Sequence, residues 1–305
     1  MKNSDEFDCI IIGGGPAGLT AGIYLARFRR SAVIFDNLDS RASRIPLSHN
    51  YPCFPSGISG KDLLKKFHEQ LSSYPIPIIN KKVETLKKDE QGFLIEVEEN
   101  LYRTNNIILA TGVKDNEPEL PNLLDGVFKG LIRHCAVCDA FEVINRKLAV
   151  IGEGDQGLNE ALFLRNYTPN VTLITSEKSN LWSKKQLKLI SDANIKITDL
   201  KIEAIELTKS KAEIVFVDGK TEHYDSLYSA LGCIKNNKLA IDVDAKLSKG
   251  LIVVNKKQET SVPGLYAAGD IVSGLNQICV AESQAAIAAT AIHDKLNKTK
   301  GYTLI

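Results

Sequence analysis

The apolar positions near the start of the chain form a short compact run, and the pattern then changes to a helical one. Residues 7–12 read as a buried strand, a glycine-rich turn follows at 13–18, and apolar side chains recur at helical spacing over 19–29. A second short apolar run at 32–35 predicts another strand, which ends at Asp36. The sequence therefore begins with a predicted strand, turn, helix and strand.

The same order of patterns recurs in the second half of the chain. A strand, a glycine-rich turn, a helix and a further strand are predicted at 147–151, 152–157, 158–165 and 170–175. Alternating apolar and polar residues, typical of β-hairpins, follow the two units at 83–108 and at 195–230. The last periodic segment, 280–296, predicts a long helix. The repetition indicates two related α/β domains that arose by internal duplication.

The first glycine-rich turn matches the dinucleotide-binding fingerprint in its required context. Gly13 permits the tight bend, Gly15 lets the backbone approach a pyrophosphate, and Gly18 lets the helix pack on the strand. The start of the helix attracts phosphates, and Asp36 stands 23 residues past Gly13 as a partner for a ribose. These positions predict a nucleotide site. The competing interpretation is a tight turn that holds no ligand.

The second turn repeats this spacing with Gly152, Gly154 and Gly157. Two such turns predict an α/β fold with two Rossmann-like domains, each with three layers in the order ββα. Two nucleotide sites in one chain suggest a carrier that stays bound and a second nucleotide that delivers electrons to it.

A pair of cysteines stands between the two nucleotide units. Of the six cysteines, only Cys135 and Cys138 have a spacing with chemical meaning, and a C-x-x-C pair is either half of a zinc site or a redox dithiol. A four-ligand zinc site needs two more cysteines or histidines at matching spacing, and His134 alone completes only a poor one. Redox use is therefore favoured over a metal site and over a structural pair of thiols.

Charge and composition exclude several other classes of function. The chain of 305 residues has 38 basic and 37 acidic residues, a formal net charge of +1, which argues against nucleic acid or an anionic membrane as the main partner. Its apolar runs are much shorter than a membrane span of about 20 residues. The first eight residues lack the basic and then apolar order of a signal peptide. We expect a cytoplasmic protein without a metal site.

The order of motifs along the chain resembles that of the low-molecular-weight thioredoxin reductases and their close relatives. The resemblance covers nearly the whole chain and rests on the motifs at 12–18, 50–52, 110–112, 135–139, 152–154 and 264–270. Each motif alone is common among flavoproteins. The dithiol placed just before the second glycine-rich turn, with Asp139 directly after it, is specific to this group.

The resemblance implies a discontinuous FAD domain, 1–114 and 247–305, and an NAD(P) domain, 115–246, that carries the dithiol. It implies FAD contacts from positions far apart in the sequence, namely Gly13, Gly15, Pro16, Ala17, Gly18, Asp36, Asn50, Val83, Thr111, Gly269, Asp270, Gln277 and Ile278. For the last two, the competing interpretation is that they only begin the final helix. The residues implied for the nicotinamide cofactor are Gly152, Gly154, Asp155 and Gly157.

The resemblance also implies a mechanism. Hydride passes from nicotinamide to flavin, and the reduced flavin reduces the disulfide through attack involving Cys138. Cys135 then attacks the substrate disulfide, and Asp139 is the candidate general acid for the leaving sulfur. The alternative role for Asp139 is a helix N-cap. A homodimer, and a rotation of the NAD(P) domain on hinges near Lys114 and Lys246, follow from the same resemblance.

Two segments depart from the family pattern. Thioredoxin reductases usually carry a His-Arg-Arg run that meets the 2′-phosphate of NADPH, but this chain has Ser176, Glu177 and Lys178 there. Glu177 suits a ribose diol, whereas the other two suit a phosphate, so NADPH is favoured and NADH stays open. The usual Gly-Gly-Gln-Leu near the flavin is also absent. Arg41 in the segment that replaces it resembles the branch that includes gliotoxin-type dithiol oxidoreductases; it contacts an FAD phosphate or is a surface charge.

The prediction is an FAD-dependent NAD(P)H:disulfide oxidoreductase that passes electrons through Cys135 and Cys138 to the disulfide of a thioredoxin-like protein. Two alternatives stay open. One is a reductase or oxidase of a low-molecular-weight disulfide or dithiol, for which the Arg41 segment is the main support, and the other is a redox sensor without turnover.

We expect Cys53 to be a packed loop thiol and Trp182 to lie on a solvated helix.

Overall fold

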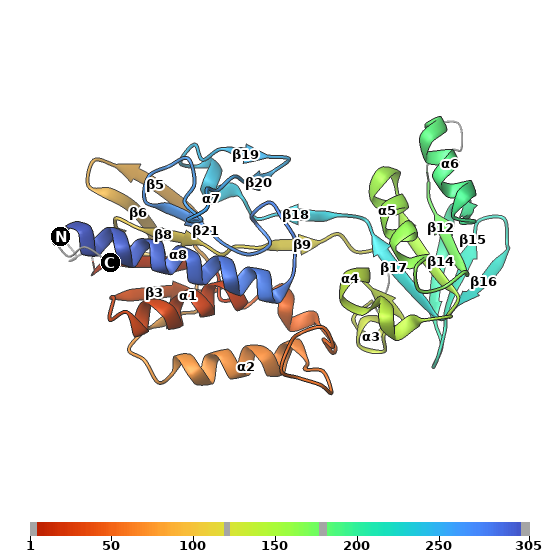
Figure 1. The fold of residues 1–305 in the computed structure, drawn as a ribbon, viewed down its shortest axis with the longest axis horizontal. Helices are drawn as coiled ribbons and strands as arrows, with labels where there is room; N and C mark the ends of the chain where they lie inside the picture. Colours follow the sequence, from red (N-terminus) through yellow and green to blue (C-terminus); the bar gives the residue numbers. More distant parts are fainter. Residues whose placement is uncertain (1–4, 119–122, 177–181, 300–305) are drawn as a thin grey trace. The chain divides into compact units, whose positions relative to one another are not determined.

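The computed structural model describes residues 5–118, 123–176 and 182–299, which fold into two compact units (Figure 1). The first unit contains Met1–Ser43, Ser59–Lys114 and Lys235–Ile305, and the second contains Arg44–Ile58 and Asp115–Ile234. The chain therefore leaves the first unit and later returns to it.

A parallel five-stranded sheet forms the centre of the first unit. Its strands, in spatial order, are β21 (Leu265–Ala267), β8 (Ile107–Leu109), β2 (Cys9–Ile12), β3 (Ala32–Phe35) and β4 (Ile78–Ile79). Every residue of β2, β3 and β8 is buried, because other layers cover both faces of the sheet. These strands are therefore continuous apolar runs in the sequence.

Helices cover one face of this sheet, and a smaller sheet covers the other. The helices are α1 (Pro16–Arg27), α2 (Gly60–Leu71) and α8 (Ile278–Thr299), and α1 packs along α8. The smaller sheet contains β1 (Asp5–Phe7), β7 (Asn100–Thr104), β6 (Gly92–Val97) and β5 (Thr85–Asp89). Ile10 and Ile12 of β2 belong to the core on the side of the smaller sheet, and Ile11 belongs to the core on the helical side. The order of layers is ββα.

The structure divides the predicted strand at 7–12 into two, so the prediction of one strand is wrong. β1 ends at Phe7 and pairs with β7, whereas β2 begins at Cys9 and enters the parallel sheet. Asp8 lies between them. Its carboxylate accepts a hydrogen bond from the Ser31 N–H at 3.0 Å, and its own N–H donates to the Ser31 hydroxyl at 2.9 Å. These local hydrogen bonds satisfy the backbone where the chain changes sheets.

The second unit repeats the plan. Its parallel sheet contains β10 (Ile132–Arg133), β17 (Ser226–Ala230), β11 (Leu148–Gly152), β12 (Val171–Ile174) and β13 (Lys196–Thr198). The helices of this unit are α3 (Leu123–Phe128), α4 (Ala136–Asp139), η2 (Ala140–Val143), α5 (Gly154–Leu164) and α6 (Lys184–Asp192). An antiparallel sheet contains β14 (Ile202–Leu207), β15 (Ala212–Phe216) and β16 (Thr221–Tyr224).

Two apolar cores hold these layers together. One contains Leu158 of α5, Tyr228 of β17 and Trp182, and the other contains Ile214 of β15 and Leu227 of β17. Trp182 is therefore buried beside the start of α6, and the expectation that it lies on a solvated helix is wrong. The capping box at Ser183 and Gln186 begins α6 only after this tryptophan.

Short elements complete the fold. β9 (Val113–Asp115) and β18 (Cys233–Lys235) pair as a two-stranded sheet where the chain passes from one unit to the other. The first unit also contains α7 (Lys238–Ile241), β19 (Leu247–Ser248) and β20 (Leu251–Ile252). The turn η1 (Arg41–Arg44) begins the segment that replaces the usual family pattern.

The prediction of an α/β fold with two Rossmann-like domains is confirmed. The helices begin earlier than their apolar periodicity indicates, at Pro16, Gly154 and Ile278. At Pro16 and Gly154 the first turn consists of proline and of small or polar residues, which carry no periodic apolar signal. Among the described residues, no helix is both long and apolar enough to cross a membrane.

A buried arginine ties the end of α1 to α8. The Arg30 guanidinium donates to Nδ1 of His293 at 3.1 Å and to the side-chain oxygen of Asn297 at 2.5 Å, and the His293 ring stacks on Phe28 with centroids 4.5 Å apart. Desolvation and the positive charge of Arg30 lower the pKa of His293. The imidazole must be neutral to accept this hydrogen bond.

We expect this cluster to make the protein less stable in mild acid. Because the pKa of His293 is lower in the folded state, its contribution is fully present above the unfolded value of about 6.5 and is lost as the pH falls through the folded value. The melting temperature should therefore fall below about pH 6.5, and His293→Gln should flatten that part of the profile. His68→Gln on α2 is the control and should leave the profile unchanged. An unaltered profile in His293→Gln contradicts the assignment.

Candidate functional site

The first glycine-rich turn is closed too tightly for side chains. A Cβ at Gly18 would lie 1.8 Å from the carbonyl oxygen of Gly13, and a Cβ at Gly14 would lie 2.1 Å from Oδ2 of Asp36. Gly13 has a φ of +118°, which L side chains rarely adopt. Gly14 was missing from the residues singled out in the sequence, since the fingerprint leaves its position free. The turn brings the backbone of residues 13–18 to the end of β2.

The N-terminus of α1 follows this turn without a side-chain cap. Gly15 is its N-cap residue and no side-chain hydrogen bond caps the helix, whereas Ser59 caps α2 by accepting from the N–H of Asp62. Pro16 at the first position lacks an N–H in any case. The remaining N–H groups of the first turn are available to an anionic ligand. Ala17 is buried in the core behind them.

Asp36 lies at the end of β3, beside the turn. Its side chain is 4% exposed, and Oδ1 accepts a hydrogen bond from the N–H of Leu38 at 3.0 Å. Oδ2 occupies the space next to Gly14. The carboxylate is thus fixed beside the glycine-rich turn, where the fingerprint expects a partner for a ribose.

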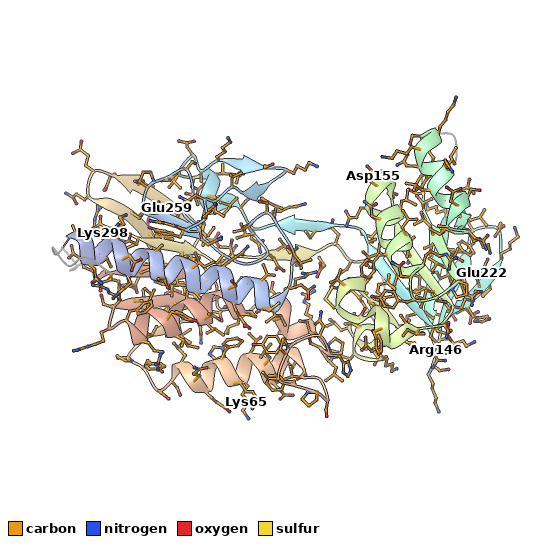
Figure 2. The ribbon with its side chains drawn as sticks, in the orientation of Figure 1. Lys65, Arg146, Asp155, Glu222, Glu259 and Lys298 are labelled. Carbon is orange, nitrogen blue, oxygen red and sulfur yellow. A yellow bond between two sulfur atoms is a disulfide. The ribbon has the colours of Figure 1, made fainter. Side chains whose placement is uncertain are left out.

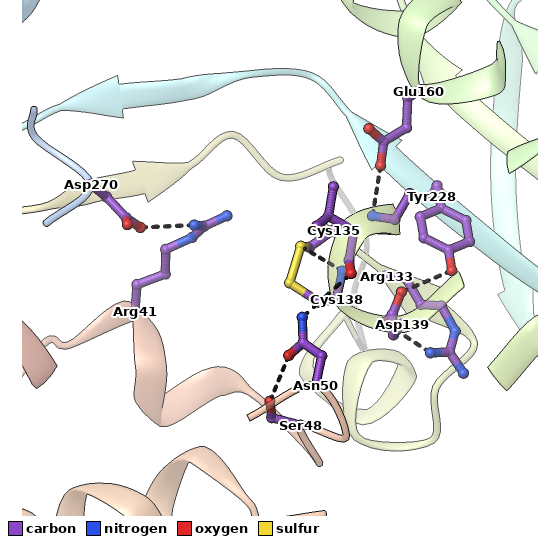
Figure 3. The surroundings of a disulfide bond; sticks show 12 residues. Arg41, Ser48, Asn50, Arg133, Cys135, Cys138, Asp139, Glu160, Tyr228 and Asp270 are labelled. Atoms are coloured by element: carbon purple, nitrogen blue, oxygen red, sulfur yellow. Dashed lines mark hydrogen bonds and ion pairs between the residues drawn. A yellow bond between two sulfur atoms is a disulfide. The ribbon is translucent and has the colours of Figure 1, made fainter. Parts of the chain in front are cut away.

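Arg41 and Asp270 form an ion pair in the first unit (Figure 3). The Arg41 guanidinium lies 2.9 Å from Oδ2 of Asp270, and both side chains are partly exposed. Arg41 is on η1, and Asp270 follows β21. The structure therefore brings together two residues that the sequence assigned separately to FAD.

The other residues assigned to FAD have different surroundings. The Thr111 hydroxyl donates to the carbonyl of Asn236 at 2.7 Å, and Val83 is buried in the core beside the smaller sheet. Gly269 has a φ of +83°, and its N–H donates to the Gln284 side chain at 2.8 Å. Gln277 and Ile278 lie at the start of α8, where the Gln277 carbonyl accepts from the N–H of Ala281 at 3.0 Å. Their contact with FAD stays a prediction.

The second glycine-rich turn repeats the first. A Cβ at Gly157 would lie 2.6 Å from the carbonyl carbon of Gly152, and Gly154 has a φ of +53°. No side chain caps α5 at its N-cap residue Glu153. Asp155 lies in the first turn of α5 (Figure 2), and its Oδ1 accepts from the Gln186 side chain at 2.8 Å. This turn therefore offers a second set of N–H groups to an anion.

The residues expected to distinguish NADPH from NADH lie mostly outside the described part of the chain. Glu177 and Lys178 are among the residues that the structure does not describe. The hydroxyl of Ser176 is hydrogen-bonded to the carboxylate of Glu153. The choice between the two nucleotides stays a prediction.

Cys135 and Cys138 are joined in a disulfide at the start of α4 (Figure 3). Cys135 is the N-cap residue, and its Sγ accepts from the N–H of Cys138 at 3.2 Å. Both cysteines are partly exposed. An N–H group directed at Sγ stabilises a thiolate, so this hydrogen bond favours Cys135 as the nucleophile after reduction.

Asp139 is held by two partners from the central sheet. The Arg133 guanidinium of β10 lies 2.8 Å from Oδ2, and the Tyr228 hydroxyl of β17 donates to Oδ1 at 2.8 Å. Burial raises the pKa of Asp139, while the charge of Arg133 opposes that rise. Burial also raises the pKa of Tyr228 above its usual range, so it keeps its proton. Asp139 is the N-cap residue of η2, but its side chain makes no capping hydrogen bond there.

A second buried carboxyl, Glu160 of α5, reaches the dithiol segment. Its Oε1 accepts a hydrogen bond from the N–H of Ala136 at 2.9 Å, and burial raises its pKa. Sequence reasoning missed Glu160, Arg133 and Tyr228. The position of Glu160 within the helix that follows the second glycine-rich turn was the only available signal.

Asn50 lies against the dithiol helix within the second unit. Its side-chain nitrogen donates to the carbonyl of Val137 at 3.4 Å, and its oxygen accepts from the Ser48 hydroxyl at 3.1 Å. The predicted contact of Asn50 with a flavin stays a prediction. Cys53 on the same segment is an exposed free thiol with a φ of +72°, so the expectation that it is packed is wrong.

No cluster of three or more metal-ligating side chains occurs among residues 5–118, 123–176 and 182–299. In this structure the sulfurs of Cys135 and Cys138 bond to each other. The geometry therefore supports disulfide exchange at this pair.

Known proteins share this architecture. A family model described as pyridine nucleotide-disulphide oxidoreductase matches residues 7–285. The thioredoxin reductase of Borreliella burgdorferi is 31% identical over 283 residues, covering 87% of this chain and 84% of that protein. A Clostridium pasteurianum protein described as a 34.2 kDa protein in the rubredoxin operon is 29% identical over 303 residues, covering 95% of this chain and 97% of that protein. The crystal structure of thioredoxin reductase from Streptococcus pyogenes superposes with a TM-score of 0.89 at 25% identity, covering 97% of this chain and 100% of that chain.

Two Rossmann-like domains and a C-x-x-C disulfide beside the second glycine-rich turn define a dinucleotide-dependent oxidoreductase with a redox dithiol. The chain belongs to the pyridine nucleotide-disulphide oxidoreductase family. The predicted resemblance to the low-molecular-weight thioredoxin reductases is confirmed, as is the prediction of a flavoprotein enzyme that acts between a pyridine nucleotide and a disulfide.

Proposed function

We propose that the chain binds FAD in its first unit and NADPH in its second, and reduces the disulfide of a thioredoxin-like protein through Cys135 and Cys138. The observation that carries this proposal is the Cys135–Cys138 disulfide at the start of α4, with Asp139 directly after it. The division of the chain into an FAD domain, 1–114 with 247–305, and an NAD(P) domain, 115–246, belongs to the same proposal.

The residues of each glycine-rich turn fit a dinucleotide. At Gly18 and at Gly157 the space where a Cβ atom would lie is filled by backbone, and in both units the helix that follows the turn has no side-chain cap. A pyrophosphate is the ligand that such N–H groups favour. In the first unit we assign Asp36, which is held beside the turn, to the adenosine ribose and Arg41 to a phosphate. When bound, FAD accepts hydride from the nicotinamide and supplies an electron pair to the disulfide.

The dithiol then acts by thiol–disulfide exchange. The Cys135 thiolate attacks one sulfur of the substrate disulfide, which forms a mixed disulfide and releases the other substrate sulfur as a thiolate. Cys138 attacks Sγ of Cys135, restores the Cys135–Cys138 disulfide and releases the second substrate sulfur. The substrate gains two electrons and two protons, and the dithiol loses them. Asp139, with its raised pKa, supplies a proton to a leaving sulfur.

Exposed apolar side chains around the dithiol favour a protein substrate. Segment 123–144 carries five large exposed apolar residues, Leu124, Phe128, Val137, Phe141 and Ile144, of which Phe141 is 72% exposed. Val137 lies between the two cysteines in the sequence. Apolar side chains that remain in water beside a reactive group are typical of a protein-binding surface. A small disulfide makes contact with too little surface to require them.

The second candidate is an enzyme for a low-molecular-weight disulfide or dithiol. The observation in its favour is that Arg41, the residue on which that resemblance rests, pairs with Asp270 rather than standing alone on the surface. A comparison of turnover with a thioredoxin and with small disulfides distinguishes the two candidates. A homodimer, a cytoplasmic location and a rotation on hinges near Lys114 and Lys246 stay predictions.

We expect an anaerobic titration of the purified flavoprotein with NADPH to consume about four electrons per flavin, two for FAD and two for the disulfide. Flavin bleaching reports the electrons taken up by FAD, and alkylation of the free thiols reports those taken up by the Cys135–Cys138 disulfide. A parallel titration with NADH identifies the donor, because the less effective nucleotide reduces the flavin more slowly.

Other stoichiometries contradict the proposal in distinct ways. Uptake of about two electrons means that the Cys135–Cys138 pair receives none from the flavin. No uptake from either nucleotide points to another donor or to a sensor. Each of these outcomes excludes the proposed transfer of electrons from NAD(P)H through FAD to the Cys135–Cys138 disulfide.

A further inference from the structure

The carboxyl of Glu160 is hydrogen-bonded to the backbone N–H of the residue that follows Cys135. Glu160 belongs to α5, the helix that begins at the second glycine-rich turn, and its Oε1 accepts from the N–H of Ala136 (Figure 3). Ala136 is the first residue of α4 and is 2% exposed. The hydrogen bond therefore fixes a buried part of the dithiol segment to a helix that is distant in the sequence.

This hydrogen bond fixes the segment between the cysteines. Two N–H groups of this segment are held by different acceptors: the N–H of Ala136 donates to Glu160, and that of Cys138 donates to Sγ of Cys135. A helix of four residues cannot hold itself in place. Glu160 supplies an anchor from outside α4.

Among residues 5–118, 123–176 and 182–299, no cationic side chain forms an ion pair with Glu160. Charged or titratable groups on and next to α4 include Asp139 on α4, Glu142 on η2, Arg133 on β10 and His134, which precedes Cys135 in the sequence. Arg133 pairs with Asp139. Tyr228 on β17 stays protonated. Glu160 accepts only the neutral N–H of Ala136. A carboxylate that is hydrogen-bonded to the residue after Cys135 disfavours a second negative charge on the Cys135 sulfur.

We infer that Glu160 is a positioning residue for the dithiol, which it holds through the N–H of Ala136 and makes more reducing through its charge. The inference rests on the proposed function of Cys135 and Cys138 as the redox pair. A thiolate carries a negative charge and a disulfide carries none. A nearby carboxylate therefore raises the free energy of the reduced pair and favours the transfer of its electrons to a substrate.

The test separates charge from hydrogen bonding. Glu160→Gln keeps an oxygen that can accept from Ala136 but removes the charge, and Glu160→Ala removes both. Glu203→Gln, at an exposed position of β14, is the matched control. Each flavoprotein is equilibrated with dithiothreitol redox buffers without nucleotide, quenched with acid, alkylated and weighed by mass spectrometry. Because no nucleotide is present, the result does not depend on electron delivery from NAD(P)H.

We expect Glu160→Gln to favour the reduced pair about tenfold, which corresponds to a reduction potential about 30 mV less negative. The alkylation of Cys135 in the reduced protein should shift to lower pH in the same variant. In Glu160→Ala the potential shift should be accompanied by faster alkylation of both cysteines, since α4 has lost its anchor.

An unchanged equilibrium in Glu160→Gln, relative to Glu203→Gln, overturns the inference, as does a shift towards the disulfide. Glu160→Gln decides the question even if Glu160→Ala fails to fold, because the glutamine preserves the shape and the acceptor. A wild-type pair that equilibrates with dithiothreitol but takes no electrons from NAD(P)H contradicts the proposed function and leaves the role of Glu160 intact.

Discussion

Replacement of Cys135 by serine is expected to lower disulfide reduction by at least about a thousandfold, because a hydroxyl is a far weaker nucleophile than a thiolate at neutral pH. The flavin itself should still accept electrons from NADPH, so flavin bleaching in the first turnover should persist. In the anaerobic titration the variant should take up only about two electrons per flavin. Turnover with a thioredoxin, measured as NADPH oxidation, supplies the rate.

Cys53→Ser is the matched control for this experiment. Cys53 is exposed and free, lies in the same compact unit as the dithiol, and forms no disulfide in the structure. Its substitution should leave both the rate and the electron count unchanged. A Cys135→Ser variant that reduces the substrate at the wild-type rate excludes Cys135 as the exchanging thiol, and a loss of activity in Cys53→Ser transfers that role to Cys53.

The repeated glycine-rich turns made the fold predictable, because their constraints are local. Gly18 is required by the carbonyl oxygen of Gly13, five residues earlier, and Gly13 itself is required by its φ of +118°. The apolar strand beside them is buried on both faces. Such features leave a clear pattern in the sequence. The division of the predicted strand at Asp8 leaves no such pattern, because it depends on hydrogen bonds to Ser31 and on the pairing of β1 with β7.

The dithiol was predictable for the same reason, whereas its surroundings were not. Cys135 and Cys138 are recognised by their spacing, and Asp139 by its adjacency. Glu160 and Tyr228 come from α5 and β17. They reach the site only because the parallel sheet and its helix place them there, and no spacing between distant positions records this. Trp182 was misjudged because charged neighbours on α6 conceal its burial beneath that helix.

Replacement of Gly18 by alanine is expected to remove FAD from the protein and to destabilise the first unit. The added Cβ would lie 1.8 Å from the Gly13 carbonyl oxygen and 2.9 Å from its carbon, so the helix and the turn must separate. Such overpacking against backbone costs about 3 kcal/mol or more. Flavin content, measured from the visible absorbance per protein, should fall well below that of the wild type, and the melting temperature should fall with it.

Gly219→Ala, in the turn between β15 and β16, is the control for a glycine substitution that meets no neighbour. Gly219 has a φ of +80°, and no atom lies within 4 Å of the added Cβ, so the cost is limited to backbone strain of about 1 kcal/mol. This variant should keep its flavin and most of its stability. If Gly18→Ala instead retains full flavin content, the pyrophosphate does not lie on the first glycine-rich turn, because α1 cannot keep its position against β2 once that carbon is added.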